Sequence, residues 1–355
     1  MKFPYMSTLT FSYALFYEGK RNDLRFLFKM LEFIGLACTS LCPVCIGIII
    51  VTSLIVILAD ANLMLIVKSK CGKKIECLSG KVVWITGASS GIGEHIAYQL
   101  ASVGCKLVLS ARRKEELERV KQTCLKLGRS HLQDEDVLVL PMDVLDFDYH
   151  KKAVQSVLDH FKKIDILVNN AGKSQRAVWS EVQLDVDREI FEINVLGPVS
   201  LTQAVLPHMM ERKQGHLVVM SSLAGILGVP GSRSYCGSKH AVHGYFDSLR
   251  TELGNNIDIT LICPGPVFSN LFQHAATGKQ GELVGRNMEN SEKRMSTERC
   301  AYLSCVAIAN RMYEVWVSQN PILFMTYITI FLPDVGKWLA SKIGAKQFLK
   351  MREGK

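Results

Sequence analysis

A glycine-rich turn between a short apolar run and a helical segment is the feature that most constrains the fold of this chain. Residues 81–86 are mostly apolar and β-branched and predict a buried parallel strand. Thr86-Gly-Ala-Ser-Ser-Gly-Ile-Gly93 follows, and residues 94–103 predict a helix. Glycines allow a tight turn and a close approach to a pyrophosphate, while the helix N-terminus supplies N–H donors. We therefore predict nucleotide contacts at Gly87, Ser89, Ser90, Gly91, Ile92 and Gly93.

Strands and helices alternate along the region that follows. Further apolar runs at residues 106–110, 136–140, 165–169 and 216–220 predict strands, with helical stretches between them. Crossovers through helices produce a parallel sheet that is covered on both faces. The predicted fold class is therefore α/β, with a Rossmann-type doubly wound parallel sheet in a single domain, residues 79–320.

The end of the second predicted strand favours NADP(H) over NAD. An acidic residue there would bind the ribose 2′-hydroxyl and repel a 2′-phosphate. The chain instead reads Ser110-Ala-Arg-Arg113 and has no acid before Glu115. Arginine offers a planar donor fork suited to phosphate, so Arg112 and Arg113 are predicted to bind NADP(H). Asp143, past the third strand, is a candidate for binding the adenine amino group, with a helix cap as the alternative.

Six short motifs follow one another along the chain: Thr86-Gly-x-x-x-Gly-x-Gly93, Asn169-Asn-Ala-Gly172, Asn194, Ser222, Tyr235-x-x-x-Lys239 and Pro264-Gly265. In order and spacing they resemble the classical short-chain dehydrogenase/reductase family over roughly residues 79–320. The resemblance implies an oxidoreductase that interconverts alcohols and carbonyls with a nicotinamide cofactor. It also implies cofactor contacts at Asp143, Val144, Asn170, Ala171, Gly172, Pro264, Gly265, Val267 and Ser269, the last where many members have threonine.

Tyr235 and Lys239 are the predicted acid/base pair. Hydride transfer at carbon requires a proton to move on the attached oxygen, but a free tyrosine ionises only near pH 10. A nearby ammonium and the oxidised nicotinamide ring are expected to lower the tyrosine pKa. The i, i+4 spacing in a helix predicted over residues 235–253 puts the two side chains on one face. The family further implies that Lys239 binds the nicotinamide ribose.

Ser222 is the predicted partner of the substrate oxygen, at the end of the strand 216–220. Its neighbour Ser221 fits that strand end equally well. The 13-residue interval to Tyr235, which family members share, selects Ser222. The family also implies that Asn194 holds a water that connects Lys239 to solvent.

The polar, glycine-containing segment 268–295 is predicted to lie over the substrate, because loops of this length are often lids. Its sequence does not specify the substrate. Apolar stretches at both ends of the chain suggest a lipophilic carbonyl or alcohol, such as a retinoid or a steroid. Cellular NADP(H) is usually reduced, so reduction is the expected direction.

Residues 33–59 contain no charged side chain and predict a transmembrane anchor. About 20 apolar residues span a bilayer as a helix, whereas a cleaved signal peptide starts nearer the N-terminus and is shorter. The anchor follows an N-terminal segment, 1–32, and precedes a linker, 60–78. A single-pass protein of the endoplasmic reticulum membrane is expected. Five basic residues before the anchor and four after it leave its orientation open.

Residues 315–333 form a second uncharged stretch. It predicts either a buried strand followed by a core helix, or a segment that rests on the bilayer as part of an apolar C-terminal extension, 321–355. A second membrane span is disfavoured.

Composition narrows the possible partners. The net charge of +9 comes without a basic stripe or a nucleic-acid-binding motif, so membrane lipid is the expected partner and nucleic acid is not. Eleven cysteines without a repeated spacing predict reduced thiols, and no metal site is expected, Cys42-Pro-Val-Cys45 included. The alternative function is an NADP(H)-binding membrane protein with a sensing or scaffold role, against which Tyr235 and Lys239 argue. A homodimer is left open.

Overall fold

A parallel sheet of seven strands organises the part of the chain that the computed structural model describes, residues 58–254, 256–285 and 294–353. The strand order is β3-β2-β1-β4-β5-β6-β7, and every neighbouring pair is parallel. The order runs outward in both directions from β1 and β4, which is the doubly wound topology predicted from the sequence. The strands are β1 Val82–Thr86, β2 Lys106–Ser110, β3 Val137–Val139, β4 Ile166–Asn169, β5 Gly215–Met220, β6 Ile257–Pro264 and β7 Glu314–Val317.

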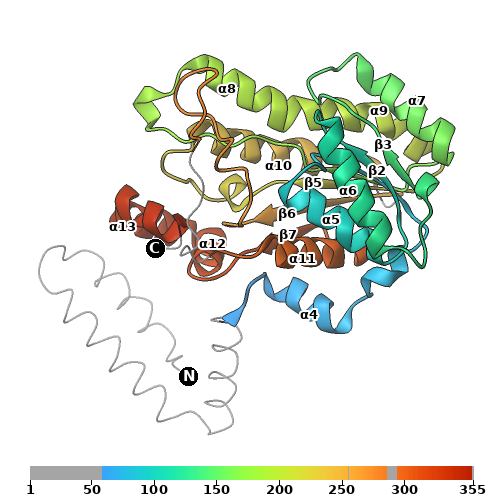
Figure 1. Ribbon diagram of the computed structural model, residues 1–355. Coiled ribbons are helices and arrows are strands. Elements are labelled where there is room, and N and C mark those ends of the chain that lie inside the picture. The colour runs from blue at the N-terminus through green and yellow to red at the C-terminus, as the bar shows by residue number, and fades with distance from the viewer. Residues whose placement is uncertain (1–57, 255, 286–293, 354–355) are drawn as a thin grey trace, which may run out of the picture. The chain divides into compact units, whose positions relative to one another are not determined.

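Helices cover both faces of the sheet (Figure 1). Alternate side chains of each strand point to opposite faces, so Val83 and Ile85 join one core while Trp84, between them, joins the other. The first core includes α5 Gly91–Ser102, α6 Lys114–Leu127 and α11 Thr297–Ala309, with α4 Leu63–Cys71 against α11. The second includes α7 Tyr149–Phe161, α9 Gly197–Glu211 and α10 Arg233–Leu253. Burial on both faces explains why the strands are apolar throughout rather than alternating with polar residues.

The predicted helix boundaries shift by two or three residues at the site. Helix α5 begins at Gly91 rather than at residue 94, because the last glycines of the turn already form its first turn. Helix α10 begins at Arg233, two residues before Tyr235. Both catalytic candidates on α10 therefore lie within its first two turns.

A long helical stretch, Leu184–Glu211, is the one part of the described residues that is long and apolar enough to cross a membrane. It consists of α8 Leu184–Phe191, a π-helical turn Glu192–Leu196 and α9. It packs against α7, α10 and β5, so it is part of the folded α/β domain. The predicted anchor, residues 33–59, lies outside the described residues except for its last two.

The C-terminal apolar stretch divides into a strand and a helix. Val315 and Val317 of β7 are buried, and α12 Ile322–Phe331 and α13 Pro333–Glu353 follow. On the outer edge of β7, the Trp316 carbonyl accepts a hydrogen bond from the Asn62 N–H at 2.8 Å. Leu63, which begins α4, donates its N–H to the Tyr327 hydroxyl of α12 at 2.9 Å. The strand of the first interpretation is present, whereas α12 buries only Leu323 and Thr326 and exposes Phe324, Ile330 and Phe331.

Candidate active site

The carboxyl ends of β1, β4, β5 and β6 meet at one edge of the sheet, where a cavity of about 570 Å³ opens. Ligands of open α/β sheets bind at this edge. All predicted site residues line the cavity except two, Gly93 and Asn194. Gly93 instead packs against Asn170, and Asn194 binds the backbone of Lys173; both of these partners line the cavity.

The glycine turn shapes the nucleotide end of the cavity. Gly87 and Gly91 have φ values of +64° and +61°, a conformation that side chains other than glycine rarely adopt. A Cβ on Gly93 would lie 2.4 Å from the Asn170 amide nitrogen, which donates to the Thr86 carbonyl at 3.0 Å. Gly93 therefore allows Asn170 to hold the turn in place.

Helix α5 points its N-terminus at the cavity, and its first turn has no side-chain cap. Uncapped N–H groups at a helix start are donors for a pyrophosphate. The residues present therefore fit a dinucleotide.

At the end of β2, Arg112 and Arg113 line the same cavity. Arg113 donates to the Ser89 hydroxyl at 3.4 Å, which holds its guanidinium over the glycine turn. Asp143 also lines the cavity, and its carboxylate accepts the Leu145 N–H at 3.1 Å. Asp143 thus holds a local turn and faces the cavity, and it does not cap a helix, because α7 begins at Tyr149 with Asp148 before it.

Tyr235 and Lys239 lie one turn apart on α10 and are both buried. The Lys239 ammonium is 5.8 Å from the centre of the Tyr235 ring and donates to the Met220 carbonyl at 2.7 Å. Burial lowers the pKa of Lys239 to about 8. The lysine is therefore anchored to the end of β5 and carries a charge that titrates at mildly alkaline pH.

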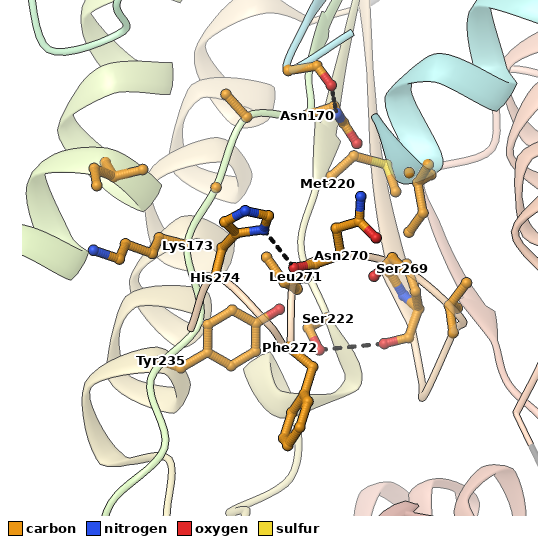
Figure 2. A pocket seen from close by; sticks show the side chains of 18 of the residues that line it. Asn170, Lys173, Met220, Ser222, Tyr235, Ser269, Asn270, Leu271, Phe272 and His274 are labelled. Atoms are coloured by element: carbon orange, nitrogen blue, oxygen red, sulfur yellow. Dashed lines mark hydrogen bonds between the residues drawn. The ribbon is translucent and has the colours of Figure 1, made fainter. Parts of the chain in front are cut away.

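Ser222 faces the Tyr235 hydroxyl across the cavity (Figure 2). Its hydroxyl donates to the Pro264 carbonyl at 3.3 Å and accepts the Ala224 N–H at 3.1 Å. Ser221, the alternative, turns its hydroxyl inward to the His243 ring nitrogen at 2.8 Å. The geometry therefore favours Ser222 as the residue that meets a substrate oxygen.

The surroundings of the Tyr235 hydroxyl act on its pKa in both directions. Burial raises its pKa above the ordinary value of 10, while a hydrogen bond with Ser222 and the positive charge of Arg176 act in the opposite direction. The prediction that the Lys239 ammonium and the oxidised nicotinamide ring together lower this pKa concerns the cofactor-bound site and stays a prediction. Burial of the phenol outweighs the favourable charges around it.

Asn194 lies in the π-helical turn between α8 and α9. Its side chain accepts the Lys173 N–H at 2.8 Å and donates to the Lys173 carbonyl at 2.9 Å and the Ser238 hydroxyl at 3.0 Å. A Cβ on Gly172 would lie 3.1 Å from the Asn194 oxygen and 3.7 Å from the Lys239 nitrogen. Glycine at this position thus lets Asn194 and Lys239 approach each other, as a proton relay between them would require.

The loop after β6 carries the last predicted contacts. The Gly265 N–H donates to the Val317 carbonyl at 2.9 Å, and a Cβ there would overlap the Ser318 hydroxyl. Pro264, Val267 and Ser269 line the cavity beside it.

The described part of the segment 268–295 helps to line the cavity, to which it contributes Phe272 and His274 (Figure 2). Ala276 connects this loop to the segment after β4, since its N–H donates to the Ser174 carbonyl at 2.9 Å. Ile322, the first residue of α12, also lines the cavity. Sequence reasoning missed Arg176, His274, Ile322 and the ion pair between Lys173 and Glu189 (2.6 Å), because no local motif marks them.

The fold and this set of residues define an oxidoreductase of the NAD(P)-binding Rossmann type, and the chain belongs to the short-chain dehydrogenase/reductase family. A family profile described as short chain dehydrogenase matches residues 81–280. The chain is similar to the human protein named Dehydrogenase/reductase SDR family member 7, with 47% identity over 299 residues, 83% of this chain and 87% of the relative.

Two solved structures of similar fold contain nicotinamide cofactors. A short-chain dehydrogenase/reductase from Burkholderia phymatum in complex with NAD has a TM-score of 0.62 at 25% identity, covering 73% of this chain and 95% of that chain. An actinorhodin polyketide ketoreductase variant with NADPH has a TM-score of 0.50 at 30% identity, covering 54% and 72%. Structural neighbours of this fold therefore bind NAD in one case and NADPH in another.

Proposed function

We propose that this protein is a membrane-anchored, NADP(H)-dependent reductase of lipophilic carbonyl compounds, which also runs in reverse as an alcohol dehydrogenase. The observation that carries the proposal is the shared cavity. The hydroxyls of Tyr235 and Ser222 face one end of it, and the uncapped N-terminus of α5 faces the other. One ligand that spans the cavity can therefore bind its phosphates at α5 and present its reactive ring to the two hydroxyls.

Ser222, Tyr235 and Lys239 have separate roles in the reaction at the substrate carbonyl. When bound, NADPH supplies the hydride. Ser222 donates a hydrogen bond to the substrate oxygen and stabilises the charge that develops there. Tyr235 gives that oxygen a proton in reduction and takes it back in oxidation. Lys239, anchored on the Met220 carbonyl, orients the cofactor ribose and exchanges protons towards Asn194.

Replacement of the acid/base residue tests this chemistry. Tyr235→Phe should lower kcat with a lipophilic aldehyde and NADPH by at least about a hundredfold, because general acid catalysis contributes on that order. Tyr245→Phe is the matched control, since Tyr245 lies on the same helix, is exposed and does not line the cavity. Unchanged turnover in the Tyr235 variant would refute the mechanism. Negligible turnover in the wild type, with NADPH still bound, would favour the sensing or scaffold alternative.

Arg112 and Arg113 support the choice of NADP(H), because both line the nucleotide end of the cavity. A guanidinium there favours a 2′-phosphate over a 2′-hydroxyl. Arg112→Glu should weaken NADPH binding by at least about tenfold relative to NADH, measured by fluorescence titration. Arg129→Glu provides an exposed control outside the cavity. Equal losses for the two cofactors would reject the preference.

The surface of α4 and α12 supports a lipophilic substrate and membrane contact. Large apolar side chains are exposed on α4 and on α12 and the residues after it: Leu63, Met64, Val67, Phe324, Ile330, Phe331, Leu332, Val335 and Trp338. A patch of this kind marks an interaction site, and Lys68 and Lys70 at the end of α4 suit anionic headgroups. Because Ile322 of α12 also lines the cavity, the same helix borders the apolar surface and the active site.

Fractionation of cells tests the membrane part of the proposal. We expect the full chain to stay in the membrane pellet after alkaline carbonate extraction and to colocalise with a marker of the endoplasmic reticulum. Release into the supernatant would count against a spanning anchor at residues 33–59.

A further inference from the structure

The face of helix α10 that carries Tyr235 and Lys239 continues to His243. The three residues follow one another at intervals of four, so their side chains lie on one side of the helix. His243 does not line the cavity, so it can act on the reaction only through its neighbours. Its ring contacts residues of β6 and β7 and of the segment directly after β5.

Ser221 is the main partner of the His243 ring. Its hydroxyl oxygen lies 2.8 Å from Nε2, whereas the Cys263 thiol is 3.6 Å from the same nitrogen. The Ser221 hydroxyl is also 3.5 Å from the Lys239 carbonyl, which is too long for a strong hydrogen bond. The short contact between Ser221 and His243 is therefore the effective bond.

Glu314 orients the ring from its other side. One carboxylate oxygen, Oε2, lies 3.4 Å from His243 Nδ1, and the other accepts a hydrogen bond from the Trp316 indole N–H at 2.6 Å. Burial raises the pKa of Glu314, but hydrogen bonds led by that from His243 outweigh burial and lower it. An ionised carboxylate only accepts hydrogen bonds, so the ring proton belongs on Nδ1. Nε2 is then the acceptor to which the Ser221 hydroxyl donates.

The bond from Ser221 to His243 connects the two elements that carry the reacting hydroxyls. Ser221 directly precedes Ser222, whose hydroxyl faces Tyr235 across the cavity (Figure 2). The Ser221 backbone is bound to β6, since its N–H donates to the Ile262 carbonyl at 2.7 Å. Its side chain is bound to α10, the helix of Tyr235. Ser221 therefore joins the end of β5 both to the sheet and to the helix.

Lys239 makes another link between α10 and β5, because its ammonium donates to the Met220 carbonyl at 2.7 Å. Lys239 also lines the cavity, where the proposed reaction requires it to orient the cofactor and exchange protons. The link through His243 lies outside the cavity. It is also closely packed, since a Cβ on Gly225 would lie 2.9 Å from the Ser221 hydroxyl and 3.0 Å from His243 Nε2. This second link is thus independent of the ligands.

We propose that His243 is a positioning residue for the reaction, which acts through Ser221 to set the place of the Ser222 hydroxyl relative to the Tyr235 hydroxyl. The inference rests on the proposed function, in which these two hydroxyls bind and protonate one substrate oxygen. Small errors of position between reacting groups lower the rate by large factors. A hydrogen bond that served stability alone would instead lower the unfolding free energy and leave kcat of the folded protein unchanged.

The first test measures turnover by the full-length protein in detergent, with cinnamaldehyde and NADPH as probes. His243→Ala should lower kcat by at least about tenfold, because a displacement of about 1 Å can lower a rate by about a hundredfold. The KM for NADPH should stay within about twofold, since His243 lies outside the cavity. His243→Gln should recover most of the lost kcat, because a glutamine amide can bind the Ser221 hydroxyl. His240→Ala, at an exposed position on the same helix, is the matched control and should keep the wild-type kcat.

Ser221→Ala removes the other end of the same bond. Alone it should lower kcat as much as His243→Ala does, and the double variant should lose no more than either single variant. Losses that multiply in the double variant would overturn the inference, because the two residues would then act separately. A folded His243→Ala protein with the wild-type kcat would also overturn it, as would a His243→Gln protein that recovers nothing.

Hydrogen exchange followed by mass spectrometry gives a readout that is independent of turnover. The backbone amides of residues 221–225 should exchange faster in His243→Ala than in the wild type or in His243→Gln, because the end of β5 loses its link to α10. Equal exchange in the three proteins would overturn the inference even without turnover of cinnamaldehyde. If His243→Ala does not fold, Ser221→Ala serves for both measurements.

The inference and the proposed function fail in different ways. Unchanged turnover in Tyr235→Phe would overturn the proposed function and the inference with it. Loss of turnover in Tyr235→Phe, together with full activity in His243→Ala, would overturn the inference alone.

Discussion

Replacement of Lys239 by methionine should make the cofactor-free protein more stable while abolishing its activity. Burial lowers the pKa of this lysine from 10.5 to about 8. The difference means that the charged ammonium destabilises the folded state by about 3 kcal/mol at neutral pH. Methionine has a similar length and no charge. Loss of the hydrogen bond to the Met220 carbonyl destabilises the variant by about 1 kcal/mol. The unfolding free energy should therefore be about 2 kcal/mol higher than that of the wild type at pH 7.

The pH dependence distinguishes this explanation from simple repacking. Between pH 8 and 10.5 the unfolded chain binds a proton at Lys239 that the folded chain has released, so stability from this group rises with pH in that window. The advantage of Lys239→Met should therefore be full below pH 8 and shrink towards pH 10. Urea unfolding in detergent, followed by tryptophan fluorescence, measures both the gain in stability at pH 7 and its change with pH, since Trp84 is fully buried.

A matched control is Lys151→Met, at an exposed position on α7, which should change the unfolding free energy by less than about 0.5 kcal/mol. The reasoning is refuted if Lys239→Met is no more stable than the wild type at pH 7. It is also refuted if the advantage is the same at pH 7 and pH 10.

Two further substitutions probe the glycine turn at the cavity and an ion pair at the amino ends of β1 and β4, on the opposite edge of the sheet. Gly93→Ala should weaken NADPH binding about tenfold or more in a fluorescence titration, because its Cβ would lie 2.4 Å from the Asn170 amide, whereas Gly244→Ala has open space and should bind normally. Asp165→Asn should lower the unfolding free energy by about 3 kcal/mol at pH 7, because the buried carboxylate pairs with Arg212 at 2.9 Å. Burial raises the pKa of Asp165, but bonds led by that from Arg212 outweigh burial and lower it. The stabilisation by the Asp165 carboxylate is therefore present above the ordinary carboxyl pKa and is lost as the pH falls through the lower pKa of the folded state. In urea unfolding, Asp165→Asn should therefore lower the unfolding free energy less in acid than at pH 7. An equal loss at both pH values would contradict the ion pair with Arg212.

The sheet and the motif residues were predictable because each depends on local sequence. Apolar runs of four to eight residues separated by helices give parallel strands, and the carboxyl ends of such strands share one edge. That rule brings the glycine turn, Ser222 and Pro264 to one cavity, whereas Tyr235 reaches it from helix α10. The i, i+4 spacing of Tyr235 and Lys239 likewise predicted their common helix face.

The remaining features depend on contacts between distant parts of the chain. Arg176 follows no motif, and its place at the cavity is set by Ala276 and Ser232, which are far from it in sequence. The π-helical turn at Asn194 has no composition that marks it in advance. The direction in which the Tyr235 pKa shifts could not be predicted from the sequence. Burial is the largest cause of the shift, and burial is a property of the whole fold.

The bond between Asn62 and Trp316 has a practical consequence for work with shortened proteins. It occupies a backbone acceptor on the outer side of β7, at the edge of the sheet where another strand could otherwise add. A protein that starts after α4 would lose this cover and expose an apolar edge strand, so it should self-associate through that edge. Truncation at about residue 60, which removes the predicted anchor but keeps Asn62, should yield the better-behaved catalytic domain.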